Sequence, residues 1–172
     1  MKKYIFVSVL AAAMLTACGN GQESVPVDAT VGNTEVVTES EVKAEITAAA
    51  ITSAVTAEIE IPSAVEKSID NIGAFYNTDT SKIADMSVLI CGSGAYPDEL
   101  AAFKFTDSES AKSGAEAVRE RLESQTALYK DYTPDEAYKL EDAVIIEKDN
   151  WVVLAICSDN ARAKEIISGL LQ

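Results

Sequence analysis

The residue types that usually perform catalysis are scarce in this chain. It contains no histidine, which excludes Ser-His-Asp and Cys-His arrangements, imidazole metal ligands and histidine pH switches. Its three cysteines are Cys18, Cys91 and Cys157, too few for a structural zinc site without histidine. Ser93 lies between two glycines, and because no general base is implied near it, we interpret this segment as a loop. We therefore expect no cofactor.

Carboxylates are the remaining groups for chemistry. They cluster at Asp98–Glu99, Asp135–Glu136 and Glu141–Asp142, and such oxygens could bind Ca²⁺. None of the clusters has the alternating ligand spacing of an EF-hand loop. We interpret them as surface charge and predict no metal site. A hydrolase of the cell envelope that uses two carboxylates stays the alternative function, although no facing pair can be identified.

A group of aromatic residues is the best candidate for recognition. Tyr129, Tyr132 and Tyr138 gather around Pro134, with three carboxylates between them. Rings mixed with carboxylates could stack on a sugar or hold a cationic peptide. The ordinary alternative is a helix-to-strand connection whose tyrosines cap the edge of the core. Trp151, at the start of a predicted strand, is a fourth candidate binding residue.

The N-terminal segment is built like a secretory signal. Two lysines, an apolar run over Tyr4–Leu15 and small residues precede Cys18. Residues 15–18 resemble the lipobox of bacterial lipoproteins. The resemblance implies cleavage before Cys18 and lipidation of its sulfur, which incorporated palmitate would label. A transmembrane helix would need about 20 residues, more than this run provides, whereas an ordinary signal peptide with a chance cysteine is the remaining alternative.

The charge of the chain limits its partners. The sequence has 28 acidic and 14 basic residues, a net charge of −14. Such a field repels phosphate backbones, so we expect no nucleic-acid partner. It also repels anionic lipid headgroups, and therefore only the lipid anchor would hold the protein at the membrane. The acidity could attract cations or basic wall components, or serve only as a solvated surface.

Composition divides the chain into three parts. We predict a signal peptide over residues 1–17, a disordered acidic tether over 18–60 and one domain over 61–172. The tether region contains no aromatic residue and is rich in Ala, Thr, Val and Glu. Residues 41–61 could instead form a marginal helix, which their many Thr and Val residues disfavour. A Ser-x-x-Lys match at Ser40–Lys43 lacks its partner motifs, and we interpret it as accidental.

Hydrophobic periodicity predicts an α+β domain. Its elements follow the order helix, strand, strand, helix, strand, strand, helix, which suggests one four-stranded antiparallel sheet with packed helices. Strand order cannot be read from spacing. The predicted elements are helices at 61–76, 107–128 and from 159 to the C-terminus, and strands at 86–91, 99–106 and within 143–157.

The last two strands carry the clearest signal, a hairpin turning at Asp149–Asn150. This turn places Lys148 opposite Trp151 and makes both faces of the hairpin apolar in the middle. The hairpin is therefore either covered on both sides or leaves an apolar patch for a partner. Cys91 and Cys157 end predicted strands, and they could form a disulfide between neighbouring strands or stay buried and free.

Four segments carry a resemblance to a known family. They are Pro97–Lys104, Arg121–Gln125, Tyr132–Pro134 and Asn150–Leu154. Through these segments, residues 83–167 are similar to the lipoproteins catalogued as domain of unknown function 4358. Asp149 departs from the glycine that is usual in the tight turn. The resemblance implies a small anchored protein of Gram-positive bacteria and supplies no assigned activity.

Together these patterns predict a location more sharply than a function. We expect a lipoprotein anchored in the cell membrane on its extracytoplasmic face, acting as a binding or interaction module of the envelope. Its expected partner is an envelope protein, a peptide or a glycan. A carboxylate-dependent envelope hydrolase is the alternative.

Overall fold

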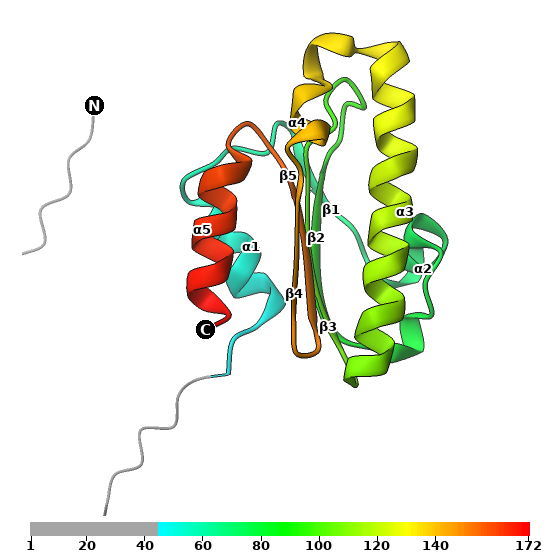
Figure 1. The fold of residues 1–172 in the computed structure, drawn as a ribbon, viewed down its shortest axis with the longest axis vertical. Helices are drawn as coiled ribbons and strands as arrows, with labels where there is room; N and C mark the ends of the chain where they lie inside the picture. The colour runs from blue at the N-terminus through cyan, green and yellow to red at the C-terminus, as the bar shows by residue number, and fades with distance from the viewer. Residues whose placement is uncertain (1–44) are drawn as a thin grey trace, which may run out of the picture. The chain divides into compact units, whose positions relative to one another are not determined.

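Five antiparallel strands form the centre of the fold (Figure 1). The computed structural model describes residues 45–172, so the predicted lipobox, Cys18, the Ser-x-x-Lys match and the tether up to residue 44 lie outside the described residues. The α+β class is confirmed, but the predicted number of four strands is wrong. In the order β1-β2-β3-β5-β4, the bounds are β1 Ala64–Glu66, β2 Ile83–Cys91, β3 Glu99–Phe105, β5 Trp151–Ile156 and β4 Val144–Lys148.

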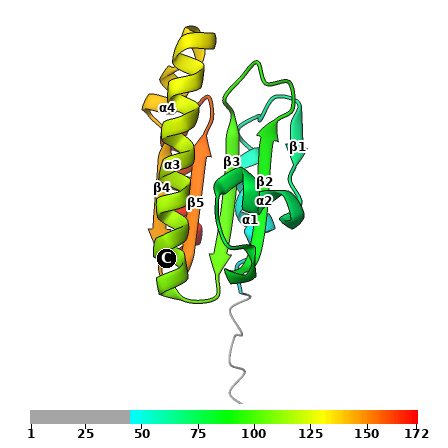
Figure 2. The same ribbon diagram turned by 90° about the vertical axis from the view of Figure 1, so that its right-hand side faces the viewer.

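Helices cover both faces of this sheet. One layer contains α1 and α5 and the other contains α2 and α3, with the strands between them (Figures 1 and 2). The α-helices are α1 Ala48–Thr56, α2 Ile69–Tyr76, α3 Ser108–Tyr132, α4 Tyr138–Glu141 and α5 Asn160–Leu170, and the short 3-10 helices are η1 Thr80–Lys82 and η2 Pro134–Glu136.

The central hairpin has the predicted register. Lys148 pairs with Trp151 and Ile146 pairs with Val153. Every residue of β5 is buried, because alternate side chains enter the two cores on opposite faces of the sheet. Coverage of the hairpin by the protein's own helices is therefore confirmed. β2 and β3 also pair as an antiparallel hairpin.

The helix predicted over residues 61–76 is wrong in its first half. Residues 64–66 form β1, which pairs with the end of β2, and only Ile69–Tyr76 is helical. Ser63 has a left-handed φ of 49°, incompatible with a continuous helix. Gly92 permits the close approach, since an added Cβ there would lie 2.6 Å from Val65 Cγ2. The apolar spacing from residue 61 suited a helix, but β2 offered a free edge that this segment pairs with.

The last part of the predicted tether is folded. Thr47 caps α1 by accepting a hydrogen bond from the amide of Ala50 at 3.1 Å, and Ile51 and Val55 are fully buried. Thr52 Oγ1 lies 2.7 Å from Ser87 Oγ on β2. Sheet packing thus outweighs the weak helix propensity of this segment. The folded part begins before residue 61, the boundary that composition suggested.

The two cysteines of the described region are free and buried. Cys91 ends β2 and Cys157 follows β5, and both strands flank β3. Two strand spacings amount to about 9.6 Å, beyond the reach of a disulfide. The prediction of two buried thiols is confirmed.

The long helix α3 sets the position of the site described below. It starts at the cap Asp107, whose side chain accepts from the amide of Ser110 at 2.7 Å, and it has 25 residues where β3 has seven. At 1.5 and 3.3 Å per residue, these lengths are about 38 and 23 Å. The helix therefore runs beyond the upper end of the strands (Figure 1).

Candidate functional site

Exposed rings gather where α3 extends beyond the sheet. We call this region the tyrosine end: residues 92–98 between β2 and β3, and residues 128–142 from the last turns of α3 through η2 and α4. These segments lie together at the upper end in Figure 1. Four of the six exposed large hydrophobic side chains of the described residues belong to it, with exposed fractions of 41% for Tyr96, 57% for Leu128, 74% for Tyr132 and 49% for Tyr138.

Tyr129 supports the tyrosine end from below. Its side chain is buried in the core between the sheet and α3. Its hydroxyl donates toward the carbonyl oxygens of Tyr96 at 2.8 Å and Gly94 at 3.1 Å. Burial is the main reason why the pKa of Tyr129 lies above its usual value. This candidate binding residue is thus a support that holds the loop of residues 92–98 against α3.

A buried ion pair fastens α4 to the same loop. Lys139 donates from Nζ to Asp98 Oδ2 at 2.8 Å and lies 2.8 Å from Glu136 Oε2. Burial alone would lower the pKa of Lys139, but the hydrogen bonds to Asp98 and Glu136 outweigh it and raise the pKa. The same ammonium lies 5.3 Å from the centre of the Tyr96 ring. Asp98 Oδ1 is buried without a hydrogen-bond partner among the described residues.

Asn160 ties α4 to the sheet. Its amide nitrogen donates to the Lys139 carbonyl at 2.8 Å, and its amide oxygen accepts from the Cys157 backbone at 2.9 Å. Burial raises the pKa of the Cys157 thiol. This thiol is therefore a poor nucleophile, and its surroundings serve packing.

A second buried charge lies on the α2–α3 side. Glu99 accepts hydrogen bonds from Arg121, with Oε2 2.7 Å from Nη2 and Oε1 3.1 Å from Nε, and from the hydroxyl of Tyr76. The guanidinium carbon of Arg121 lies 3.7 Å from the centre of the Phe75 ring. Burial, followed by the negative charge of Glu99, raises the pKa of Tyr76 well above its usual value. Asp98 and Glu99 are therefore paired structural groups, which corrects our interpretation of them as surface charge.

Trp151 does not belong to the tyrosine end. It is buried in the core under α1 and α5, and it pairs with Lys104 at the end of β3 far from Glu99. The Lys104 ammonium lies 5.6 Å from the centre of its ring. The four candidate residues thus separate: Tyr132 and Tyr138 are exposed, Tyr129 supports them, and Trp151 lies at the opposite end.

Tyr96 is the exposed aromatic residue that sequence reasoning missed. The sequence could have identified it as a loop residue, because Tyr96 lies between a Gly-rich turn and Pro97 in a loop that joins two predicted strands. The loop of residues 92–98 lies at one end of β2 and β3. Because α3 starts at the other end of β3, it runs back toward this loop. The length of α3 then brings Tyr129 to the loop.

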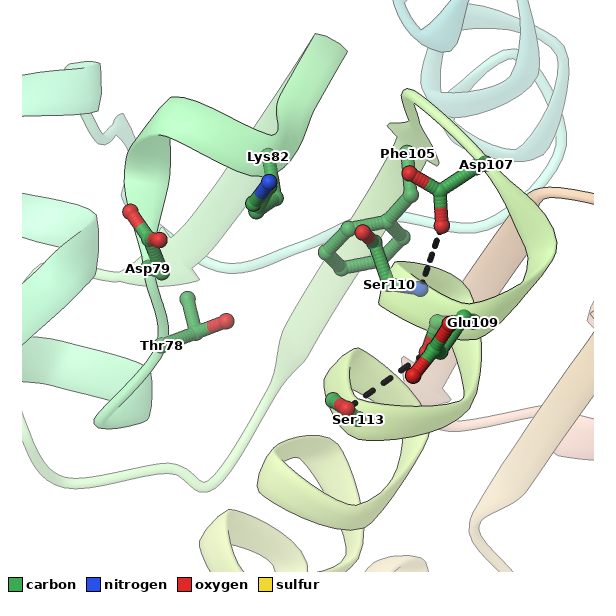
Figure 3. Close-up of a pocket in the computed structure, with 8 residues that line it drawn as sticks. All are labelled: Thr78, Asp79, Lys82, Phe105, Asp107, Glu109, Ser110 and Ser113. Atoms are coloured by element: carbon green, nitrogen blue, oxygen red, sulfur yellow. Dashed lines mark hydrogen bonds between the residues drawn. The ribbon is translucent and has the colours of Figure 1, made fainter.

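Two of the remaining carboxylates of the described residues, Asp79 and Asp107, act as helix caps beside one hollow. A hollow of about 460 Å³ beside the start of α3 is lined by Asp79, Asp107 and Glu109 among others (Figure 3). Asp79 and Asp107 lie on different walls, and each caps a helix. Hydrogen bonds to Ser81 and Ser110, respectively, lower the pKa of both.

Two further findings for residues 45–172 concern metal-binding clusters and membrane-spanning helices. No group of three or more His, Cys, Asp or Glu side chains in this range is placed to hold a metal ion. None of the helices in it combines the length and the apolar character needed to cross a membrane.

The comparison with known families identifies the central part of the fold, from the end of α1 to the end of β5. The family model described as "Domain of unknown function (DUF4358)" matches residues 57–157, more than half of the 172 residues, and the chain belongs to this family. The match confirms the predicted resemblance over residues 83–157 and extends it back to Ala57 at the end of α1, whereas residues 158–167 of the predicted range lie outside it. No curated protein matches the chain, and no solved structure matches it either.

Proposed function

We propose that this protein is a lipoprotein anchored through Cys18 on the extracytoplasmic face of the cell membrane, where its tyrosine end binds another component of the envelope. The lipobox-like residues 15–18 support the anchor. Two acyl chains suffice for stable anchoring, so the acidic surface need not contact the membrane.

The entry point of the chain supports an outward-facing tyrosine end. Glu45, the first described residue, forms an ion pair with Lys104, at the end of β3 that lies beside the turn of β4 and β5. The loop of residues 92–98 is at the other end of β3, about 23 Å away at 3.3 Å per residue. A tether attached at the first end leaves the tyrosine end free to face away from the membrane.

One observation carries the binding role: Tyr132 is 74% exposed on a support that is itself rigidly paired. The segments on either side of it are fastened to the loop of residues 92–98, by the hydroxyl of Tyr129, bonded to two carbonyls, and by the buried pair of Lys139 and Asp98. Large rings with a polar tip are enriched where proteins recognise partners. Because the backbone that carries the ring is already ordered by these contacts, binding need order only the side chain, which favours affinity.

Site-specific photo-crosslinking in intact cells tests this role. A benzoylphenylalanine at position 132 is expected to yield one dominant crosslinked species after irradiation. The matched control is the same photoreactive residue at Ser168, an exposed position of α5. Equal crosslinking from both positions, or none from position 132, would contradict a binding role for the tyrosine end.

The anchor has a separate test. Cells grown with labelled palmitate should incorporate label into the wild-type protein, and the Cys18→Ala variant should lose it. Label in that variant equal to wild type would reject lipidation at Cys18, without bearing on the binding surface.

A further inference from the structure

The tyrosine end combines its rings with an excess of exposed negative charge. Its exposed carboxylates are Asp131, Asp135, Glu141 and Asp142, whereas Lys130 is its only exposed cation. Lys139 does not offset them, because it is buried and already paired with Asp98 and Glu136. The whole chain, with this region included, carries a net charge of −14. This charge attracts cationic partners toward the surface and repels anionic polymers.

Other aromatic rings of this protein form cation–π contacts within the domain. The Arg121 guanidinium stacks over Phe75 at 3.7 Å, and the Lys139 ammonium lies over Tyr96 at 5.3 Å. Tyr132 and Tyr138 are different, since no cation of the described residues lies over either ring. Both side chains are exposed to solvent. The same segment of the chain carries Asp131 and Asp135, which are exposed and form no ion pair within the described residues.

We infer that the partner of the tyrosine end is a basic polypeptide segment, whose Arg or Lys side chains pack over Tyr132 and Tyr138 and pair with Asp131 and Asp135. This inference rests on the proposed binding function and names its partner class. A neutral glycan would stack on the rings without using the carboxylates. A basic peptide uses both, through cation–π contacts and charge-assisted hydrogen bonds.

Fluorescence anisotropy with two peptides and a glycan tests the inference. The mature lipidated protein, held in phosphatidylcholine nanodiscs so that no anionic lipid competes, is titrated with labelled (Arg-Gly)₅, (Ser-Gly)₅ and chitotetraose. We expect binding of the arginine peptide only, with affinity falling as salt rises. Binding of chitotetraose in place of the peptide would assign the surface to glycans and overturn the inference.

Paired variants separate a local site from bulk charge. Asp131→Asn with Asp135→Asn should weaken binding about three- to tenfold. Asp70→Asn with Glu116→Gln removes the same charge from exposed positions of α2 and α3 and should leave it unchanged. Equal weakening by both pairs would show that the peptide senses only net charge, against the inference.

The rings have their own control. Tyr132→Leu should weaken the arginine peptide about two- to fivefold, whereas Tyr132→Phe, which keeps the ring, should bind like wild type. Wild-type affinity in Tyr132→Leu would overturn the inference. If the peptide fails to bind while position 132 still crosslinks specifically in cells, the partner class is wrong and the proposed binding function stands.

Discussion

Two adjacent carboxylates, Asp98 and Glu99, are buried and ion-paired inside the domain. Each is 2% exposed and each is held by one cation, Lys139 and Arg121 respectively. Breaking a buried pair costs far more than breaking an exposed one, because the remaining charge cannot return to water. These pairs fasten α4 and α3 to the start of β3, directly under the tyrosine end.

Arg121→Met should lower the free energy of unfolding by about 3–5 kcal/mol, because Glu99 would stay buried without its cation. Arg119→Met is the matched control two residues away, since Arg119 forms an exposed pair with Glu147. That change should cost at most about 1 kcal/mol. Urea unfolding measures both, and equal losses would show that burial of Glu99 adds nothing.

Alkaline pH should destabilise the domain partly through Tyr76. Its folded pKa lies well above the ordinary value of 10.0, so the unfolded chain releases this proton first. The stabilisation is therefore complete below pH 10 and is lost as pH rises toward the folded pKa. Urea unfolding between pH 8 and pH 11.5 should show this decline, and Tyr76→Phe should flatten it. An identical slope in the variant would refute the role of Tyr76.

At the scale of elements, close packing decides where α3 lies. Gly114 faces Phe105 on β3, and an added Cβ would lie 2.0 Å from its Cζ. The ring is 2% exposed and also lines the hollow at the start of α3, so an added methyl group would force it to leave its present position. The contact sets how near the helix approaches the sheet, and hence how its last turns meet the loop of residues 92–98.

Gly114→Ala should therefore destabilise the protein by about 1–3 kcal/mol, the usual cost of overpacking. Helix propensity alone predicts the opposite sign, a gain of up to about 1 kcal/mol. Gly169→Ala in α5 isolates that gain, since nothing lies within 4 Å of the added Cβ. Thermal unfolding should shift down for the first variant and up for the second. An upward shift for both would exclude tight packing at Gly114.

α1 should be indispensable for folding. Ile51 and Val55 are fully buried against the sheet, and losing such side chains costs about 2–5 kcal/mol each. A chain of residues 45–172 should unfold cooperatively in urea, whereas one of residues 61–172 should lack a cooperative transition. If both show the same midpoint, α1 contributes nothing to the core.

Sequence patterns predicted the elements whose cause is local. The turn at Asp149–Asn150 determines the hairpin register by itself, and alternating apolar residues identify β3. β1 could not be predicted, because three residues form a strand only when the edge of β2 is available. α1 lies within residues 41–61, where the sequence left a marginal helix as an alternative, because its helix propensity is low and burial against the sheet stabilises it. The tyrosine end was only partly predictable, because Tyr96 joins it through the length of α3.

At the scale of the whole molecule, the two ends of the sheet differ in role. The chain enters beside the Lys104 end of β3, where Glu45 is bound, and the exposed rings lie at the other. The chain as a whole carries a net charge of −14, which repels anionic headgroups. Anchoring at one end and recognition at the other is the arrangement that our proposal requires.

Labelling of a single introduced thiol in intact cells tests this arrangement most directly. Cys91 and Cys157 are buried, and a lipidated Cys18 would not react, so Tyr132→Cys would supply the one reactive thiol. A membrane-impermeant maleimide should label this variant as fast in intact cells as in lysed cells, and should leave the wild type unlabelled. Labelling of Tyr132→Cys only after lysis would contradict a tyrosine end displayed outside the membrane.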